Sequence, residues 1–273
     1  MMWNLAPLAN DFCFGQSPRW FEGLLWFADT AGEAVHTVNL RGSVTKLDLR
    51  GHAPSGLAFS LDGSLLIASA ERRAVLRYDG DKVSTVADLA TLVPSALGDV
   101  VVDHRGRAYI ESRAVEGGAI VRLDPDGRAT VVADNLEYPN GMLITADGAT
   151  LIVAEAVGRR LTAMTIGEDG TLTGRRVFAG GLDGRPGGIT LDTDGGVWTS
   201  LSIAHQFQRI TDGGAVTQRI DMRSDRVAVA CALGGSRGRT LFLLSSTDAY
   251  PESLSGTYLS RLDTASVDVP GVG

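Results

Sequence analysis

The stretch GLAFSLDGSLLIA, residues 56–68, contains the element that decides the fold. An apolar segment at residues 56–59 is followed by the turn Asp62-Gly63 and by a second apolar segment at residues 65–68. Glycine readily takes up the positive φ that tight hairpin turns require, so the stretch predicts two antiparallel strands joined by a hairpin.

The same unit recurs along the whole chain. Its turn glycines are 40 to 47 residues apart, each between a short apolar segment and a second β-rich segment: Gly23, Gly63, Gly106, Gly148, Gly195 and Gly238. Further turns such as Asp79-Gly80 and Asp212-Gly213-Gly214 predict a second hairpin in each repeat. Two hairpins make a four-stranded blade, and blades of about 40–50 residues build propellers. The sequence therefore predicts an all-β, six-bladed β-propeller.

Other all-β folds fit the repeat less well. A β-sandwich does not repeat at a fixed period, and the rungs of a β-helix are far shorter. We therefore treat residues 1–273 as a single β-propeller domain. Extra strands at residues 1–6 and 256–262 are expected to join one blade and close the ring, which removes exposed sheet edges. Residues 245–255, which include Tyr250-Pro251, form a candidate lid.

Composition excludes several classes of function. A net charge of −7 and an isoelectric point near 5.1 argue against a nucleic-acid partner, because that requires a basic face. Residues 1–14 lack the features of a signal peptide, and no apolar stretch is long enough to span a membrane. The two cysteines, Cys13 and Cys231, form no metal-binding pattern. We expect a cytoplasmic protein that acts on a small molecule, away from membranes.

Propeller geometry indicates which side chains meet. The first strand of each blade lines the central channel and the second runs antiparallel to it, so first strands start and second strands end at the same mouth. The candidates that enter first strands are Gln16, Asp99 and Asn140, and those that leave second strands are Asp29, Glu111, Arg113, Glu155 and His205. A concave pocket with a few convergent polar groups is what a ligand site needs.

We divide these candidates into two groups by their chemistry. Asp99, Glu111 and Glu155 are candidate catalytic bases, and His205 is a candidate acid or base near neutral pH. Binding of the substrate is expected from Gln16, Asp29, Arg113 and Asn140. Structural roles stay open beside these: Asp29 fits a turn cap, His205 fits an exposed loop, and Glu155 follows an apolar strand, where an unpaired buried carboxylate is costly.

The same segments resemble the regucalcin/gluconolactonase family of senescence-marker-protein-like six-bladed propellers. The resemblance covers nearly the whole chain in order, through residues 15–20 with 25–29, 54–59, 98–100 with Asp103, 139–142, 186–189 with 192–198, 233–235 and 269–271. Family membership implies hydrolysis of sugar lactones and related compounds. It also implies a calcium or zinc ion at the channel mouth, held by a Glu, an Asn and an Asp.

The ligand positions that the resemblance implies are largely substituted in this sequence. Gln16 stands at the Glu position, Asn140 is kept, and Gly187 stands at the Asp position. Gly98 replaces a substrate-side Asn, although Asp99 follows it. Hard divalent cations depend on carboxylate oxygens for affinity. The sequence therefore predicts no metal ligands and no cofactor; Ca²⁺ or Zn²⁺ at a degraded site stays an open alternative.

Three functions are compatible with the sequence. The first is a lactone or ester hydrolase with its site at the channel mouth. The second is a metal-independent cyclase, isomerase or condensing enzyme on the same scaffold, similar to the strictosidine-synthase-like propellers. The third is a ligand-binding module without catalysis, which needs shape and hydrogen bonds but no poised acid or base.

Overall fold

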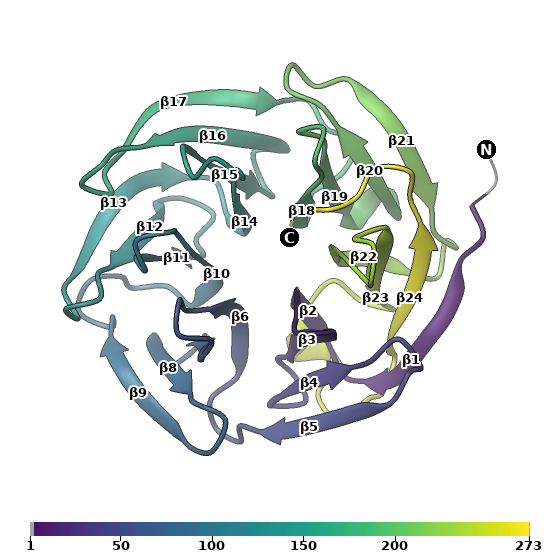
Figure 1. Ribbon diagram of the computed structural model, residues 1–273, viewed down its shortest axis with the longest axis horizontal. Helices are drawn as coiled ribbons and strands as arrows, with labels where there is room; N and C mark the ends of the chain where they lie inside the picture. Colours follow the sequence, from purple (N-terminus) through teal and green to yellow (C-terminus); the bar gives the residue numbers. More distant parts are fainter. Residues whose placement is uncertain (1–2, 273) are drawn as a thin grey trace.

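The computed structural model describes residues 3–272 and shows six four-stranded antiparallel sheets around a central channel (Figure 1). The predicted six-bladed β-propeller is confirmed. The innermost strands are β2 (Gly15–Phe21), β6 (Pro54–Phe59), β10 (Leu97–Val102), β14 (Pro139–Ile144), β18 (Pro186–Leu191) and β22 (Val227–Gly234). The second strands are β3 (Leu24–Asp29), β7 (Leu65–Ser69), β11 (Ala108–Ser112), β15 (Thr150–Glu155), β19 (Val197–Leu201) and β23 (Thr240–Ser246).

Two further strands complete each blade. The third strands are β4 (Ala34–Val38), β8 (Ala74–Tyr78), β12 (Gly118–Leu123), β16 (Arg160–Ile166), β20 (Gln206–Ile210) and β24 (Ser260–Ser266). The outermost strands are β5 (Val44–Asp48), β9 (Val83–Asp88), β13 (Ala129–Leu136), β17 (Leu172–Ala179), β21 (Val216–Asp221) and β1 (Ala6–Phe12). We number the blades 1 to 6 in the order of their innermost strands.

The hairpin between the first and second strands turns on a glycine in every blade. The six turn glycines have φ values between +66° and +82°. This left-handed region is disfavoured for residues with a Cβ atom, which explains why glycine recurs at this point of the repeat. The sequence signal that predicted the repeat therefore has a backbone cause.

The ring closes where the two ends of the chain share blade 6 (Figure 1). Strand β1 pairs with β24, with Ala6 opposite Thr264 and Phe12 opposite Ser260. The predicted closure is thus found, but the strands begin later than the expected 1–6 and 256–262, and residues 1–2 lie outside the described range. The Phe12 ring anchors β1 by packing on Phe27 of blade 1 at 4.8 Å between ring centroids.

The hydrophobic core is a ring of contacts between neighbouring blades. Each of six buried clusters joins two adjacent blades. The contact between blades 1 and 6, for example, includes Trp20 stacked on Phe242 at 5.2 Å. Burial of apolar surface between blades drives their association and holds the channel-lining strands in place.

Helical structure is minor in the described residues. It consists of two short 3-10 helices, η1 (Ser202–Ala204) and η2 (Pro251–Leu254). Within residues 3–272, no helix has the length and apolar character needed to cross a bilayer.

Candidate active site

The innermost strands are irregular near their starts, at the mouth of the channel. The pairing of every first strand with its second strand shifts at this point. A β-bulge bends its strand and re-aims the side chains within it, often beside an active site. The irregularity lies between Leu97 and Val100 in blade 3 and between Pro139 and Met142 in blade 4, and it therefore includes Asp99 and Asn140.

Glycines inside these irregular segments bring the innermost strands close together. A Cβ atom on Gly56 would lie 2.2 Å from the carbonyl oxygen of Gly98, and one on Gly141 would lie 2.6 Å from that of Gly187. Real Cβ atoms are not found at such distances, so a larger residue would push the blades apart. The polar groups of adjacent blades are consequently held near one another across a narrow channel.

A pocket of about 520 Å³ opens at this mouth, with lining residues from all six blades. Its polar wall includes Gln16, Ser55, Asp99, Arg113 and Asn140. Apolar side chains complete the wall, among them Phe14, Val115, Val157, Ile203 and Val229. The size and the mixture of apolar surface with few polar groups suit a small organic ligand.

The predicted site residues fall into two sets. Gln16, Asp99, Arg113 and Asn140 line the pocket. Glu111 is fully buried directly behind Asp99, because its Oε2 accepts a hydrogen bond from the Asp99 backbone N–H at 2.8 Å. The pocket wall does not include Asp29, Glu155 or His205 among the described residues.

Asp99 is the buried carboxylate of the pocket wall. The other two acidic residues that line the pocket, Glu71 and Glu252, are exposed, whereas Asp99 is 4% exposed. Its Oδ1 accepts hydrogen bonds from Arg19 at 2.6 Å and from the hydroxyl of Ser17, both in blade 1. Its Oδ2 accepts only one hydrogen bond from the described residues, from the Met142 backbone N–H at 3.1 Å. This oxygen keeps capacity for a further donor.

Glu111 is held by backbone donors from two blades. Its Oε1 accepts a hydrogen bond from the Gly141 N–H at 2.7 Å, in addition to the bond between Oε2 and Asp99. Burial and the nearby charge of Asp99 raise the pKa of Glu111 to about 7, although Arg113 and the two N–H donors favour the charged form. The negative charge of Asp99 therefore favours the protonated form of Glu111.

Arg113 and Gln16 lie beside this pair and contact each other across the mouth. The Nη2 atom of Arg113 donates to Oε1 of Gln16 at 3.2 Å, and Nε2 of Gln16 donates to the hydroxyl of Thr30. The Arg113 side chain is 15% exposed, and its Nε lies 4.0 Å from Oε2 of Glu111. The oxygen and the nitrogen of the Gln16 amide are therefore both hydrogen-bonded, which fixes the orientation of the amide between Arg113 and Thr30.

Glu155 has the geometry of a structural group. Its carboxylate is fully buried and pairs with Arg160 at 2.7 Å and Arg175 at 3.3 Å. It also accepts hydrogen bonds from the Thr162 hydroxyl and the Glu137 N–H. Burial alone would raise the pKa of Glu155, but these donors lower it below its usual value. An ionised carboxylate with its acceptor sites filled gives no support to the predicted role as a catalytic base.

Asp29 and His205 likewise hold the backbone together. Asp29 accepts hydrogen bonds from the backbone N–H groups of Cys13, Phe14 and Gly32, which matches the turn-cap alternative. The ring of His205 contacts the carbonyl oxygen of Arg226 at 2.8 Å, and its backbone has a φ of +54° at the end of η1. The predicted substrate contact of Asp29 and the predicted acid–base role of His205 therefore gain no support from their positions.

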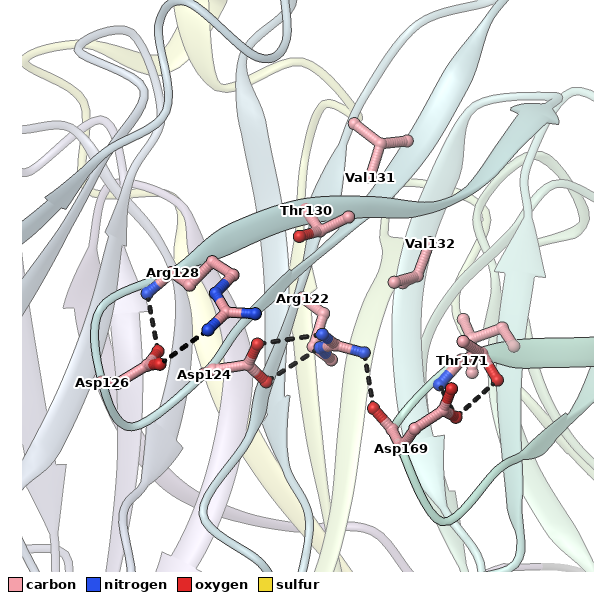
Figure 2. Close-up of a pocket in the computed structure, with 10 residues that line it drawn as sticks. Arg122, Asp124, Asp126, Arg128, Thr130, Val131, Val132, Asp169 and Thr171 are labelled. Atoms are coloured by element: carbon pink, nitrogen blue, oxygen red, sulfur yellow. Dashed lines mark hydrogen bonds and ion pairs between the residues drawn. The ribbon is translucent and has the colours of Figure 1, made fainter.

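A second hollow of about 630 Å³ lies outside the channel, between the outer hairpins of blades 3 and 4 (Figure 2). Its charged groups are paired with one another: Arg122 contacts Asp124 at 2.8 Å and the carbonyl oxygen of Asp169 at 2.7 Å. Arg128 contacts Asp126 at 3.3 Å. Charges satisfied in this way tie two blades together, and we place the candidate active site at the channel mouth instead.

Comparison with known proteins agrees with this geometry. Residues 14–247 match the family model described as "SMP-30/Gluconolactonase/LRE-like region". The chain belongs to the SMP-30/gluconolactonase family. A 6-deoxy-6-sulfogluconolactonase from Pseudomonas putida is 30% identical, over 94% of this chain and 92% of that protein. Pentonolactonase XacC from Haloferax volcanii is 25% identical, over 81% of this chain and 77% of the relative.

Solved structures confirm the same propeller. A calcium-binding protein, regucalcin, from Agrobacterium tumefaciens superposes with a TM-score of 0.84 at 20% identity, covering 100% of this chain and 96% of that one. The family resemblance noted in the sequence is therefore shown, together with the six-bladed fold. Lactonase-named relatives support a hydrolase family role for the chain.

The residues at the implied metal position do not fit a divalent cation. Gln16 is a neutral amide that already bonds Arg113, and Gly187 has no side chain. A Cβ atom on Gly187 would lie 2.6 Å from the Ser200 hydroxyl, so the space is filled by neighbours. No cluster of three or more His, Cys, Asp or Glu side chains in residues 3–272 has metal-binding geometry. A guanidinium beside the two neutral amides of Gln16 and Asn140 is the opposite of the anionic oxygen set that Ca²⁺ requires.

Sequence reasoning missed two groups of the site. Ser17 and Arg19 lie within residues 15–20, a segment of the family resemblance, yet the sequence did not indicate their contacts with Asp99. Thr30, which positions the Gln16 amide, immediately follows the end of β3, so its place after a second strand was an available signal. The candidate lid contributes four residues to the pocket lining: Ala249, Tyr250, Pro251 and Glu252. Its role as a lid stays a prediction.

Proposed function

We propose that this protein hydrolyses the ester bond of a small lactone at the mouth of its channel, with Asp99 as the general base. The observation that carries the proposal is the position of Asp99: a buried carboxylate on the wall of a 520 Å³ pocket, with one oxygen open to a further donor. Lactonases among the relatives support the reaction class.

The reaction needs little beyond a base and donors for the carbonyl oxygen. Asp99 takes a proton from a water molecule, and the water oxygen adds to the lactone carbonyl carbon. The carbonyl oxygen gains negative charge, which donors on the same wall, Asn140 and Arg113, stabilise. The bond to the ring oxygen then breaks, the ring oxygen receives the proton from Asp99, and an open-chain hydroxy acid leaves.

The supporting residues set the geometry of this step. Arg19 and the Ser17 hydroxyl hold Oδ1 of Asp99, which leaves Oδ2 for water. Glu111 fixes the backbone of Asp99 and of Gly141, and it acts as a positioning residue because its carboxylate is fully buried behind the wall. Side chains held by packing and hydrogen bonds keep a reacting group within the small tolerance that catalysis needs.

Acid release from a panel of sugar lactones, followed at constant pH, tests the proposal. We expect turnover of at least one lactone and a loss of about 100-fold or more in kcat for Asp99→Asn, the usual size of a general-base contribution. Asp103→Asn is the matched control, since Asp103 is a 3% exposed carboxylate of the same blade that pairs with Arg107 and lies outside the pocket lining. Full activity in Asp99→Asn would refute the role of Asp99.

A second candidate is a metal-independent isomerase, cyclase or condensing enzyme. It is favoured by the poor fit of the implied metal position, where Gln16 and Gly187 replace charged ligands. Mass spectrometry of the product distinguishes these candidates, because hydrolysis adds one water to the substrate, isomerisation leaves its mass unchanged, and condensation joins it to a second molecule.

A further inference from the structure

The guanidinium group of Arg113 is the half-buried positive charge of the pocket wall. Its side chain is 15% exposed, whereas the second arginine of the lining, Arg185, is exposed. A hydrogen bond from Nη2 to Gln16 fixes its orientation from blade 1. Its Nε is buried without a hydrogen-bond partner in residues 3–272. This Nε lies 4.0 Å from Oε2 of the buried Glu111 and has no surface of its own, so a ligand in the pocket would be contacted by the terminal Nη atoms of Arg113.

The position of Arg113 depends on the missing side chain of Gly98. A Cβ atom on Gly98 would lie 2.5 Å from Nε of Arg113 and 2.5 Å from Oε2 of Glu111. Any larger residue at 98 would therefore displace either the guanidinium or the carboxylate. Gly98 and Arg113 are consequently two parts of one arrangement, in which glycine provides the space that the guanidinium fills.

The same arrangement explains the neutral residue at position 16. Gln16 offers its amide oxygen to Arg113 and its amide nitrogen to Thr30. A guanidinium here already supplies a fixed positive charge, and a second cation beside it would be repelled. The substitutions that remove metal ligands and the placement of Arg113 are thus consistent with one another.

We propose that Arg113 replaces the divalent cation of this family. The guanidinium binds the carbonyl oxygen of the substrate and stabilises the oxyanion that forms there. The pocket accordingly holds no divalent ion. Arginine keeps its charge at every relevant pH, and its planar donors match the two oxygens of a carboxylate product. The oxyanion part of this inference rests on the proposed hydrolase function, but the absence of a bound cation does not.

Calorimetric titration of the chelator-treated protein with Ca²⁺ and with Zn²⁺ tests the cation part without any substrate. We expect no saturable binding tighter than about 1 mM, the weak end of protein calcium sites. One equivalent of either ion bound with micromolar affinity, and lost in Asn140→Ala, would overturn the proposal. This result stands whether or not a lactone is turned over.

Activity of Arg113 variants tests the electrophile part. We expect Arg113→Met to lose about 100- to 1000-fold in kcat, the size expected for an oxyanion donor. Arg122→Met is the matched control and should keep its kcat, because Arg122 is similarly buried (12% exposed) in the same blade but lies in the outer hollow (Figure 2).

Two further measurements separate electrophilic catalysis from a structural effect. Added guanidinium ion should restore part of the activity of Arg113→Ala, whereas the same concentration of sodium chloride should not. Gly98→Ala should lower kcat with Arg113 still present, because the new Cβ atom displaces the guanidinium or the Glu111 carboxylate beside it. An unchanged kcat in Arg113→Met would overturn the electrophilic role of Arg113. Because that variant would still hydrolyse the lactone, the proposed hydrolase function itself would stand.

Discussion

Replacement of Glu111 by glutamine tests the electrostatics of the channel wall. Burial and the charge of Asp99 raise the pKa of Glu111 from 4.5 to about 7. The folded protein therefore holds this proton more tightly than the unfolded chain does. Its contribution to stability is complete below about pH 4.5 and is lost as the pH rises through about 7. At about 1.4 kcal/mol per pKa unit, the shift corresponds to roughly 3 kcal/mol.

The assay is urea denaturation of the wild type and of Glu111→Gln at several pH values from 5 to 8. Glutamine still accepts one hydrogen bond but presents an amide N–H₂ to the second backbone donor, so the variant carries a destabilisation that does not depend on pH. Relative to the variant, the free energy of unfolding of the wild type should fall by about 2 to 3 kcal/mol across this range. Parallel pH dependences of the two proteins would refute the reasoning.

Glu155→Gln is the matched control for this experiment, because Glu155 is also fully buried but has a lowered pKa. A carboxylate of this kind contributes stability above its unfolded pKa and loses that contribution only as the pH falls through its lower folded value. Between pH 5 and pH 8 it is ionised in the folded protein and largely ionised in the unfolded chain, where the pKa of a glutamate is about 4.3. The pH dependence of Glu155→Gln should therefore run parallel to that of the wild type, at lower stability.

Three further outcomes follow from the contacts described above. Arg160→Leu should lower the free energy of unfolding by about 3 kcal/mol, measured in urea, because it leaves the buried Glu155 carboxylate short of a partner; an unchanged midpoint would contradict this. Tyr250→Ala should raise KM more than it lowers kcat in steady-state kinetics, since Tyr250 lines the pocket, and an unchanged KM would argue against a contact with substrate. Burial raises the pKa of the Cys13 and Cys231 thiols, so Ellman's reagent should modify them only on unfolding, and rapid labelling of the native protein would disprove their burial.

The fold was predictable because its signal is local and repeated. A turn glycine such as Gly63 needs a positive φ, and that requirement appears in the sequence at every repeat. Strand ends were less predictable. The end of β1 at Phe12 packs against Phe27 of blade 1, a contact between residues of different blades that no local pattern reveals.

The candidate site was predictable in position but only partly in composition. Alignment of the blades placed Gln16, Asp99, Arg113 and Asn140 at the channel mouth, and these residues line the pocket. The same alignment could not distinguish them from Glu155, because the partners that neutralise Glu155 come from β16 and β17 of its blade. The position of a residue along its strand predicts that it lies near the channel mouth. Its protonation and hydrogen bonding depend on neighbours that only the folded chain brings together.

The most direct test of the account is the fate of water oxygen in the reaction. Chelator-treated enzyme is incubated in ¹⁸O-labelled water with a lactone that the panel identifies, and the product is analysed by mass spectrometry. Water attack on the carbonyl, promoted by Asp99 and Arg113 without an added metal, predicts a product that gains one water and carries one ¹⁸O atom in its carboxylate. A product with the mass of the substrate and no ¹⁸O, or activity that appears only after Ca²⁺ or Zn²⁺ is restored, would contradict it.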